Sequence, residues 1–265
     1  MKNNILSTHA HNVFSQFGED GIIQHILTLI PPASQPWCVE FGAWDGKLYS
    51  NCSNLVTNHN WSGVMIEANK NKFSDLERNY KENQNVHCIN QFVGFSTNTI
   101  DDILSTIPIP LEFDLISIDI DGNDYHIWDS IKKYSPKVVI IEFNPTIPSD
   151  IEFIQEKNMN VNQGSSIKSI DMLAKSKGYE LVGTTFCNCF FVKKEYYSLF
   201  NLENNDPSVL WDTEPEAPRV FHLYDGTIVL SKEFRLNWTN GSIVKPLDLQ
   251  KLSTHLRVFG DNIIE

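Results

Sequence analysis

The 265-residue sequence has no excess of positive charge, no long hydrophobic segment and no regular cysteine pattern. Lysine and arginine number 21 against 33 aspartates and glutamates, which gives a formal net charge of −12. Because nucleic acids and anionic membrane surfaces bind basic faces, we expect neither as a partner. No segment is apolar enough to span a bilayer, and the first residues lack the hydrophobic core of a signal peptide, so we expect a cytoplasmic protein.

The five cysteines lack the spacing of a metal-binding or redox motif. Cys187 and Cys189 lie two positions apart rather than three, and the total number is odd. These features favour reduced thiols over disulfides or a zinc site.

Short apolar segments alternate with amphipathic segments along the first 200 residues. The predicted strands are 37–41, 63–67, 86–93, 113–120, 138–143, 179–184 and 189–193, and the predicted helices are 19–30, 53–60, 69–81, 124–133 and 167–177. A further helix begins after Thr99, with Asp102 completing a capping box. Apolar strands that alternate with helices are typical of a parallel sheet covered on both faces, and the tight connection between the last two strands predicts an antiparallel pair.

The composition changes after residue 200. Residues 201–220 are rich in Asn, Asp, Glu and Pro, which indicates an irregular loop or lid, and 228–230 reads as a strand after a turn. We therefore predict a main domain over 1–200 and a small β-rich extension over 201–265, which acts as a lid, a substrate cover or a subunit contact.

Two strand ends point to a nucleoside ligand. The first predicted strand runs into the glycine turn VEFGAWDG at 39–46, where the absence of a β-carbon at Gly42 lets a ligand approach the backbone. Glu67 ends the next strand, and a carboxylate there can accept hydrogen bonds from both hydroxyls of a ribose. Together they predict an adenosine-containing cofactor.

The charges at the strand ends indicate which cofactor. A nicotinamide site would favour G-x-G-x-x-G, and this turn has another pattern that carries an acid. Each acid taken alone reads as a solvated loop residue, but together they favour a cationic, phosphate-free ligand. The acids at this predicted edge are Asp45, Glu67, Asp119, Asp121 and Glu142.

Several segments, in this order, resemble the FkbM-type branch of S-adenosylmethionine-dependent methyltransferases. They are SQFGEDG at 15–21, VEFGAWDG at 39–46, TIDDIL at 99–104, FDLISIDIDG at 113–122, GYELVG at 178–183 and FFVK at 190–193. The resemblance implies a Rossmann-like α/β fold with a seven-stranded, mostly parallel sheet and an antiparallel last strand. It also implies methyl transfer to an oxygen, often on sugars of surface polysaccharides.

By position, the resemblance implies a set of cofactor contacts. Glu40, Gly42, Asp45 and Gly46 are expected at the methionine end, Glu67 with Ala68 and Asn69 at the ribose, and Val93 and Gly94 near the adenine. Asp119 is expected at the methyl group, and Gln16, Gly18 and Glu19 can either close over the cofactor or cap the first helix.

The acceptor is expected beyond the fourth strand. A sugar hydroxyl needs a base or a metal to take its proton, and Asp119 is the first candidate, with Asp121 and His126 as further catalytic candidates. Candidate ligands for Mg²⁺ or Mn²⁺ are Asp119, Glu142 and Asn144, although Asp-Gly after a strand is also common in turns. Candidate acceptor contacts are Asp121, Asn123, Asn144 and His222. Trp44 and Trp128 can provide an aromatic floor for a sugar ring or pack in the core.

The predicted function is therefore S-adenosylmethionine-dependent O-methylation of a sugar or nucleotide sugar in polysaccharide biosynthesis. Two alternatives remain open at this stage: a nicotinamide-dependent oxidoreductase, and a non-catalytic module that binds the cofactor. A homodimer is considered without a specific interface.

Overall fold

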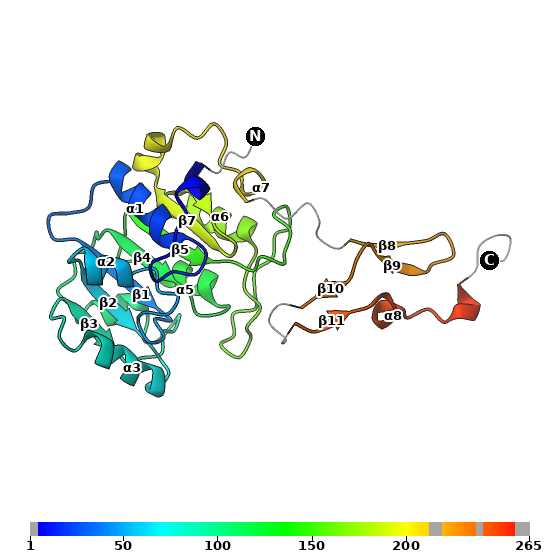
Figure 1. Ribbon diagram of the computed structural model, residues 1–265, viewed down its shortest axis with the longest axis horizontal. Coiled ribbons are helices and arrows are strands. Elements are labelled where there is room, and N and C mark those ends of the chain that lie inside the picture. The colour runs from blue at the N-terminus through cyan, green and yellow to red at the C-terminus, as the bar shows by residue number, and fades with distance from the viewer. Residues whose placement is uncertain (1–4, 212–218, 237–240, 258–265) are drawn as a thin grey trace. The chain divides into compact units, whose positions relative to one another are not determined.

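The computed structural model describes residues 5–211, 219–236 and 241–257 (Figure 1). The chain forms two compact units, Met1–Asp212 and Thr213–Glu265. None of the described helices is long and apolar enough to cross a membrane.

A seven-stranded sheet organises the first unit, with the strand order β3-β2-β1-β4-β5-β7-β6 (Figure 1). The first five strands pair in parallel, whereas β7 is antiparallel to both β5 and β6. The strands are β1 (Trp37–Phe41), β2 (Ser62–Ile66), β3 (Val86–Ile89), β4 (Leu115–Ile118), β5 (Val138–Glu142), β6 (Tyr179–Thr184) and β7 (Asn188–Lys193). The predicted Rossmann-like α/β sheet with an antiparallel last strand is therefore confirmed.

Alternate side chains of each strand enter two separate hydrophobic layers. In β5, Val139 and Ile141 face the layer formed with α4, α5 and α6, whereas Val138 and Ile140 face the layer formed with α1, α2 and α3. Burial on both faces explains why the strands are apolar throughout. The helices are α1 (Glu19–Leu29), α2 (Ser53–Asn58), α3 (Lys70–Tyr80), α4 (Ile100–Leu104), α5 (Asp124–Ser130) and α6 (Ile167–Ser176).

Several elements are shorter than their sequence pattern predicts, among them β4, which spans Leu115–Ile118 rather than 113–120. Strand β3 ends at Ile89 rather than at 93, because the Asn90 side chain donates to the main-chain oxygen of Glu67 at 2.8 Å. Helix α5 ends at Ser130, because Lys132 N donates to Asp101 Oδ2 at 2.8 Å instead of continuing the helix. The capping box at the start of α4 forms between Thr99 and Asp102 as predicted.

The first unit extends past the predicted boundary, to residue 212. After η1 (Ile5–His9) and η2 (Lys194–Phe200), α7 (Pro207–Leu210) brings Leu210 and Trp211 into the core. The Trp211 ring packs edge-on against Phe143 at 5.0 Å between centroids. This burial explains why 201–211 folds with the sheet.

The second unit is β-rich, as predicted. Its described residues form two antiparallel strand pairs, β8 (Val220–His222) with β9 (Ile228–Leu230) and β10 (Phe234–Arg235) with β11 (Ile243–Val244). The short helices α8 (Pro246–Leu249) and η3 (Thr254–Leu256) follow.

Candidate active site

The carboxyl ends of β1, β2, β4 and β5 lie at one edge of the sheet, because these strands are parallel neighbours. This edge of an open α/β sheet is where ligands bind. The predicted site residues occupy the loops that leave it.

The turn after β1 is built around Gly42, which has a left-handed φ of 73°. A β-carbon at this position would lie 1.8 Å from the main-chain oxygen of Asp119. The close approach of the backbone after β4 therefore requires glycine here, independently of any ligand that binds beside the turn.

The other residues of this turn hold its shape. Glu40 is buried and accepts hydrogen bonds from Ser50 Oγ and from Asn51 N, the latter at 2.7 Å. Burial raises the pKa of Glu40 to about 7. Asp45 Oδ1 accepts from Lys47 N at 2.9 Å and from Leu48 N at 2.8 Å, which makes a local turn. Gly46 packs against α3, where a β-carbon would lie 2.4 Å from a methyl carbon of Leu76.

Glu67 leaves the end of β2 and is fixed by the backbone. Its Oε2 accepts from Trp44 N at 2.8 Å and its Oε1 accepts from Asn69 N at 2.6 Å. A carboxylate has about four lone-pair positions, so each oxygen keeps one for a further donor. The carboxylate is buried and oriented, and it can still accept hydrogen bonds from two hydroxyl groups.

The neighbours of Glu67 have local roles. Asn69 caps α3 by accepting from Asn71 N and Lys72 N, and Ala68 is exposed beside it. Val93 is buried in the core, and Gly94 N donates to Asn98 O at 3.0 Å in the turn after β3.

The segment 15–19 contacts the turn between β6 and β7. Gly18 is the N-cap of α1, where a β-carbon would lie 2.5 Å from that of Ala10, and Gln16 is exposed. Glu19 is buried, and its Oε1 accepts from Thr185 Oγ1 at 2.8 Å and from Asn188 Nδ2 at 3.1 Å. In this structure Glu19 thus acts as a clamp between two segments far apart in the sequence.

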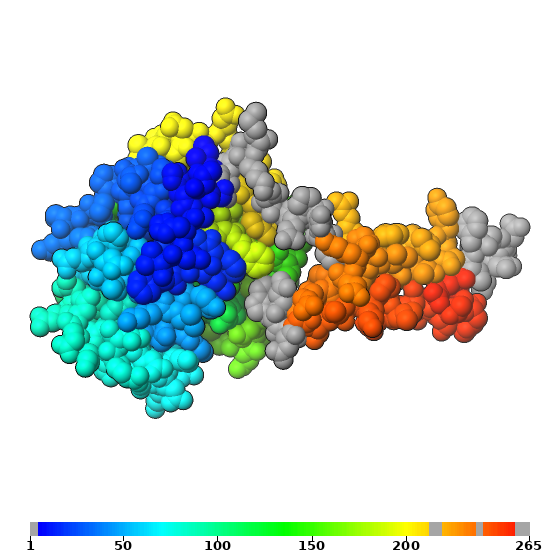
Figure 2. Space-filling model, in the orientation of Figure 1, coloured from blue at the N-terminus to red at the C-terminus, as the bar shows by residue number. Residues whose placement is uncertain are grey.

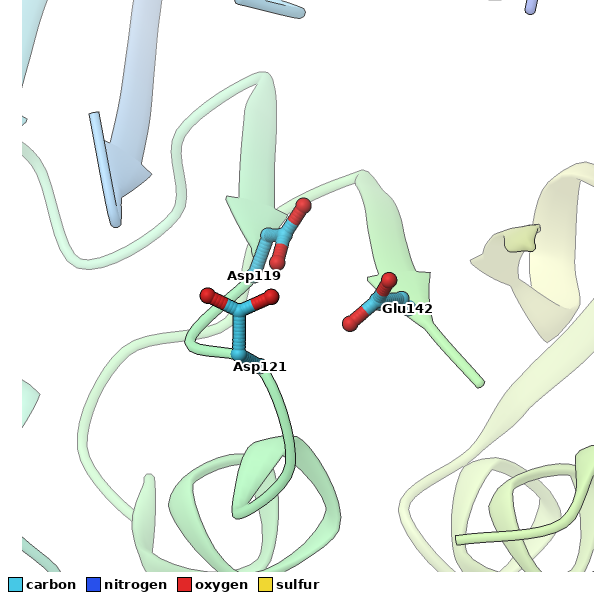
Figure 3. A group of neighbouring side chains, drawn as sticks. All are labelled: Asp119, Asp121 and Glu142. Atoms are coloured by element: carbon cyan, nitrogen blue, oxygen red, sulfur yellow. The ribbon is translucent and has the colours of Figure 1, made fainter. Parts of the chain in front are cut away.

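Three carboxylates meet beyond β4 and β5 (Figure 3). Asp119, Asp121 and Glu142 have oxygen atoms that all lie within 4.8 Å of one another. Asp121 has a left-handed φ of 56°, which is strained for a residue other than glycine. Among the described residues, no lysine or arginine forms an ion pair with these three acids.

Burial and, after it, mutual repulsion change the ionisation of these acids. Burial, followed by the charges of Asp124 and Asp121, raises the pKa of Asp119 to about 8. Burial, followed by the charge of Asp119, raises the pKa of Glu142 to about 10. The cluster therefore holds protons near neutral pH and gains from any cation that lets it ionise.

Asp124, at the start of α5, supports this cluster and was missed by the sequence analysis. Its two oxygens accept from Ile120 N at 2.8 Å and from Gly122 N at 2.9 Å, which folds the loop that carries Asp119 and Asp121. The D-x-D-G-x-D spacing in the sequence could have indicated a third acid in the same turn.

Buried Gln155 is a second residue that the sequence analysis missed. Its Oε1 accepts from Gln163 N and Gly164 N, and its main-chain oxygen accepts from His126 Nε2 at 2.7 Å. His126 therefore carries its proton on Nε2 and uses that atom in a structural hydrogen bond. No sequence signal marks Gln155, which lies in an irregular loop.

The two candidate asparagines are also held by loops. Asn123 Nδ2 donates to Asn158 O and Val161 O, both at 3.2 Å, while its buried Oδ1 has no hydrogen-bond partner. Asn144 Oδ1 accepts from both Thr146 N and Thr146 Oγ1, and Asp121 is the third acid whose oxygen lies near those of Asp119 and Glu142.

The two remaining candidates lie in different settings. His222 is in β8 of the second unit, where its side chain is exposed. Trp128 packs in the core against Phe191 and is 2% exposed, whereas Trp44 is 43% exposed with Lys72 over its ring at 4.3 Å.

The chain was compared with curated proteins, solved structures and protein-family models. No curated protein matches the chain. Among solved structures, the N-terminal domain of EvdMO1 in the presence of SAH and D-fucose is 12% identical and has a TM-score of 0.45, with 66% of this chain and 82% of that chain covered. A SAM-dependent methyltransferase from Aquifex aeolicus is 10% identical and has a TM-score of 0.41, with 66% and 88% covered.

A family model described as "Methyltransferase FkbM domain" matches residues 90–181. This segment runs from the end of β3 to β6 and contains all three clustered acids and Asp124. Residues 90–181 of the chain are therefore similar to a methyltransferase FkbM domain.

Proposed function

We propose that the protein transfers the methyl group of S-adenosylmethionine to a hydroxyl of a sugar or nucleotide sugar. The observation that carries this proposal is the cluster of Asp119, Asp121 and Glu142, which lies in the FkbM-matched segment without a lysine or arginine partner among the described residues. A sulfonium cation is the charge that such a cluster attracts.

The cofactor orientation follows from Glu67 and the glycine turn. Because two backbone N–H groups already fix the Glu67 carboxylate, its free lone pairs can accept the two ribose hydroxyls without a loss of side-chain freedom. The methionine end would then extend past Gly42 toward Asp119, whose backbone touches that turn.

The reaction is an in-line displacement at carbon. The acceptor oxygen forms a bond to the methyl carbon, the carbon–sulfur bond breaks, and the electron pair stays on sulfur as S-adenosylhomocysteine. The enzyme mainly aligns the two reactants and removes the hydroxyl proton. Asp119 is the proposed base: once the bound sulfonium has driven off its proton, a carboxylate with a pKa raised to about 8 accepts the hydroxyl proton better than an ordinary one.

His126 is a weaker candidate for the base. Its Nε2 donates to the main chain of Gln155, so that atom cannot also accept a proton from the acceptor. Asp121 and Asn123 remain candidates for contacts with the acceptor.

A divalent cation is an alternative occupant of the cluster. Asp119, Asp121 and Glu142 offer the oxygen ligands that Mg²⁺ and Mn²⁺ prefer, and together they would hold such an ion. When bound, the ion would acidify the acceptor hydroxyl. Activity that disappears with EDTA and returns with Mg²⁺ would support this arrangement.

Calorimetry with S-adenosylmethionine and with NAD⁺ tests the cofactor assignment. We expect S-adenosylmethionine to bind and NAD⁺ not to bind. The opposite result would favour an oxidoreductase, and the proposal fails if S-adenosylmethionine does not bind at millimolar concentration.

Methyl transfer itself is tested with labelled cofactor and a panel of sugars and nucleotide sugars. We expect label in at least one acceptor, and loss of that activity in Asp119→Asn with cofactor binding retained. Cofactor binding without any transfer would favour a non-catalytic module.

A further inference from the structure

Two exposed phenylalanine rings meet at the edge of the sheet that carries the candidate site. Phe17 and Phe186 are 37% and 46% exposed, and their ring centroids lie 5.1 Å apart at an interplanar angle of 46°. They come from segments that are distant in the sequence, the N-terminal loop before α1 and the turn between β6 and β7. Apolar rings kept together in solvent are typical of contact surfaces for ligands or partners.

A buried carboxylate holds the two rings together. Glu19 Oε2 accepts from Phe17 N at 2.7 Å, and Glu19 Oε1 accepts from Thr185 and Asn188 on either side of Phe186. Because Glu19 is only 1% exposed, these bonds are shielded from water and strongly direct the loop. The N-terminal segment lies on the surface of the first unit, in dark blue in Figure 2.

The turn that carries Phe186 lies beside the end of β5, which carries Glu142 of the acid cluster. Asn188 pairs with Glu142 across the sheet, and Phe143 N donates to Cys187 O at 2.8 Å. Phe186 precedes these two residues of the turn directly along the chain. Burial, followed by the charges of Glu142, Asp119 and Glu19, raises the pKa of the Cys187 thiol, which agrees with this proximity.

We propose that Phe17 and Phe186 form an aromatic platform that holds the acceptor as a pyranose ring, with Glu142 and Asp119 reaching its hydroxyl edge. This inference rests on the proposed function and specifies the part of the site that binds the acceptor. A pyranose has an apolar face of C–H groups and a polar rim, which matches apolar rings beside carboxylates. Glu19 is a positioning residue, because it acts only through Phe17 and the β6–β7 turn.

The platform is tested by saturation-transfer NMR with methyl glucoside, galactoside, mannoside, fucoside and rhamnoside, in the presence of S-adenosylhomocysteine. We expect at least one pyranoside to bind and its Kd to rise about tenfold in Phe17→Ala and in Phe186→Ala, since each truncation removes part of the apolar contact. Phe186→Tyr should retain binding. The matched control is Leu111→Ala, which removes a 55% exposed apolar side chain before β4, at the opposite edge of the sheet.

The outcomes separate this inference from the proposed function. If the wild type fails to bind S-adenosylhomocysteine and S-adenosylmethionine, the proposed function fails. If the cofactor product binds but no pyranoside binds, or if both alanine variants bind pyranosides as tightly as the wild type, the platform is overturned while the cofactor assignment stands. Circular dichroism and melting of each variant confirm that a loss of binding is not unfolding.

Discussion

At the residue scale, the glycines of the first unit differ in the space that surrounds their α-carbons. Gly42 and Gly178 both have left-handed φ angles, 73° and 83°, but a β-carbon at Gly42 would overlap the Asp119 main chain, whereas one at Gly178 would meet nothing within 4 Å. The two positions therefore separate the cost of backbone conformation from the cost of a steric clash.

We expect Gly178→Ala to lower the free energy of unfolding by about 1 kcal/mol, the usual cost of a left-handed alanine. Gly42→Ala should cost at least about 3 kcal/mol, because β1 and β4 must also separate. Urea denaturation of both variants measures the difference. Equal losses would mean that the Gly42 contact relaxes freely.

Glu142 illustrates a site residue that opposes stability. Its pKa is raised from 4.5 to about 10, so the native state keeps a proton that the unfolded state loses as the pH rises between these values. The ionisation of this group therefore lowers the free energy of unfolding progressively as the pH rises from about 5 to 10.

Replacing this acid should stabilise the fold in alkaline solution. We expect Glu142→Gln to raise the Tm more at pH 9 than at pH 5, while it weakens methyl transfer. Melting curves at both values, with Glu203→Gln as an exposed control, measure this. A gain in Tm that is equal at the two pH values would contradict the raised pKa of Glu142.

At the scale of elements, the loop before α1 is folded by one carboxylate. Asp20 Oδ2 accepts from Val13 N, Phe14 N and Ser15 N at 2.7 to 2.8 Å. Asp20 is 1% exposed, so these donors have few alternative partners in water. Asp20 and Glu19 together determine the path of residues 13–18 and the position of Phe17.

We expect Asp20→Ala to destabilise the protein by about 2–4 kcal/mol, because it leaves three backbone donors, among them the buried Ser15 N, without their acceptor. Hydrogen exchange at residues 13–15 should rise in this variant more than exchange in the sheet. Asp75→Ala, which removes an exposed ion pair with Arg78, is the control and should cost less than about 1 kcal/mol. Unchanged exchange at residues 13–15 would show that Asp20 does not organise the loop.

At the scale of the whole molecule, the net charge of −12 and the unpaired acid cluster both favour cationic ligands. Binding a sulfonium next to Asp119 and Glu142 should drive protons off the cluster, because the charged carboxylates are the binding form. Affinity should then increase with pH in the range where these groups titrate.

We expect the Kd for S-adenosylmethionine to fall as the pH rises from 6 to 9, by up to about tenfold per pH unit for each proton released. S-Adenosylhomocysteine lacks the positive sulfur and should depend less on pH, which makes it the matched control. Calorimetry in two buffers of different ionisation enthalpy counts the protons. Identical pH profiles for the two ligands would contradict the role of the cluster.

The role of the second unit is best tested by deletion at its boundary. A 1–212 variant retains the sheet and both hydrophobic layers, so we expect it to fold and to bind the cofactor. If the extension covers the substrate, acceptor KM should rise without a change in cofactor affinity. If it is a subunit contact, light scattering should detect a smaller assembly.

The sequence by itself determined the sheet, because strand and helix periodicities are local properties of burial on one or two faces. It also predicted which strand ends carry acids, since parallel strands bring their carboxyl ends together. Only the tertiary structure decided what each side chain does there. Gly42 meets Asp119, Glu19 reaches Asn188, and Phe17 meets Phe186 across chain separations that leave no periodic signal. Such contacts depend on the register between strands and on the paths of loops, which no local pattern encodes.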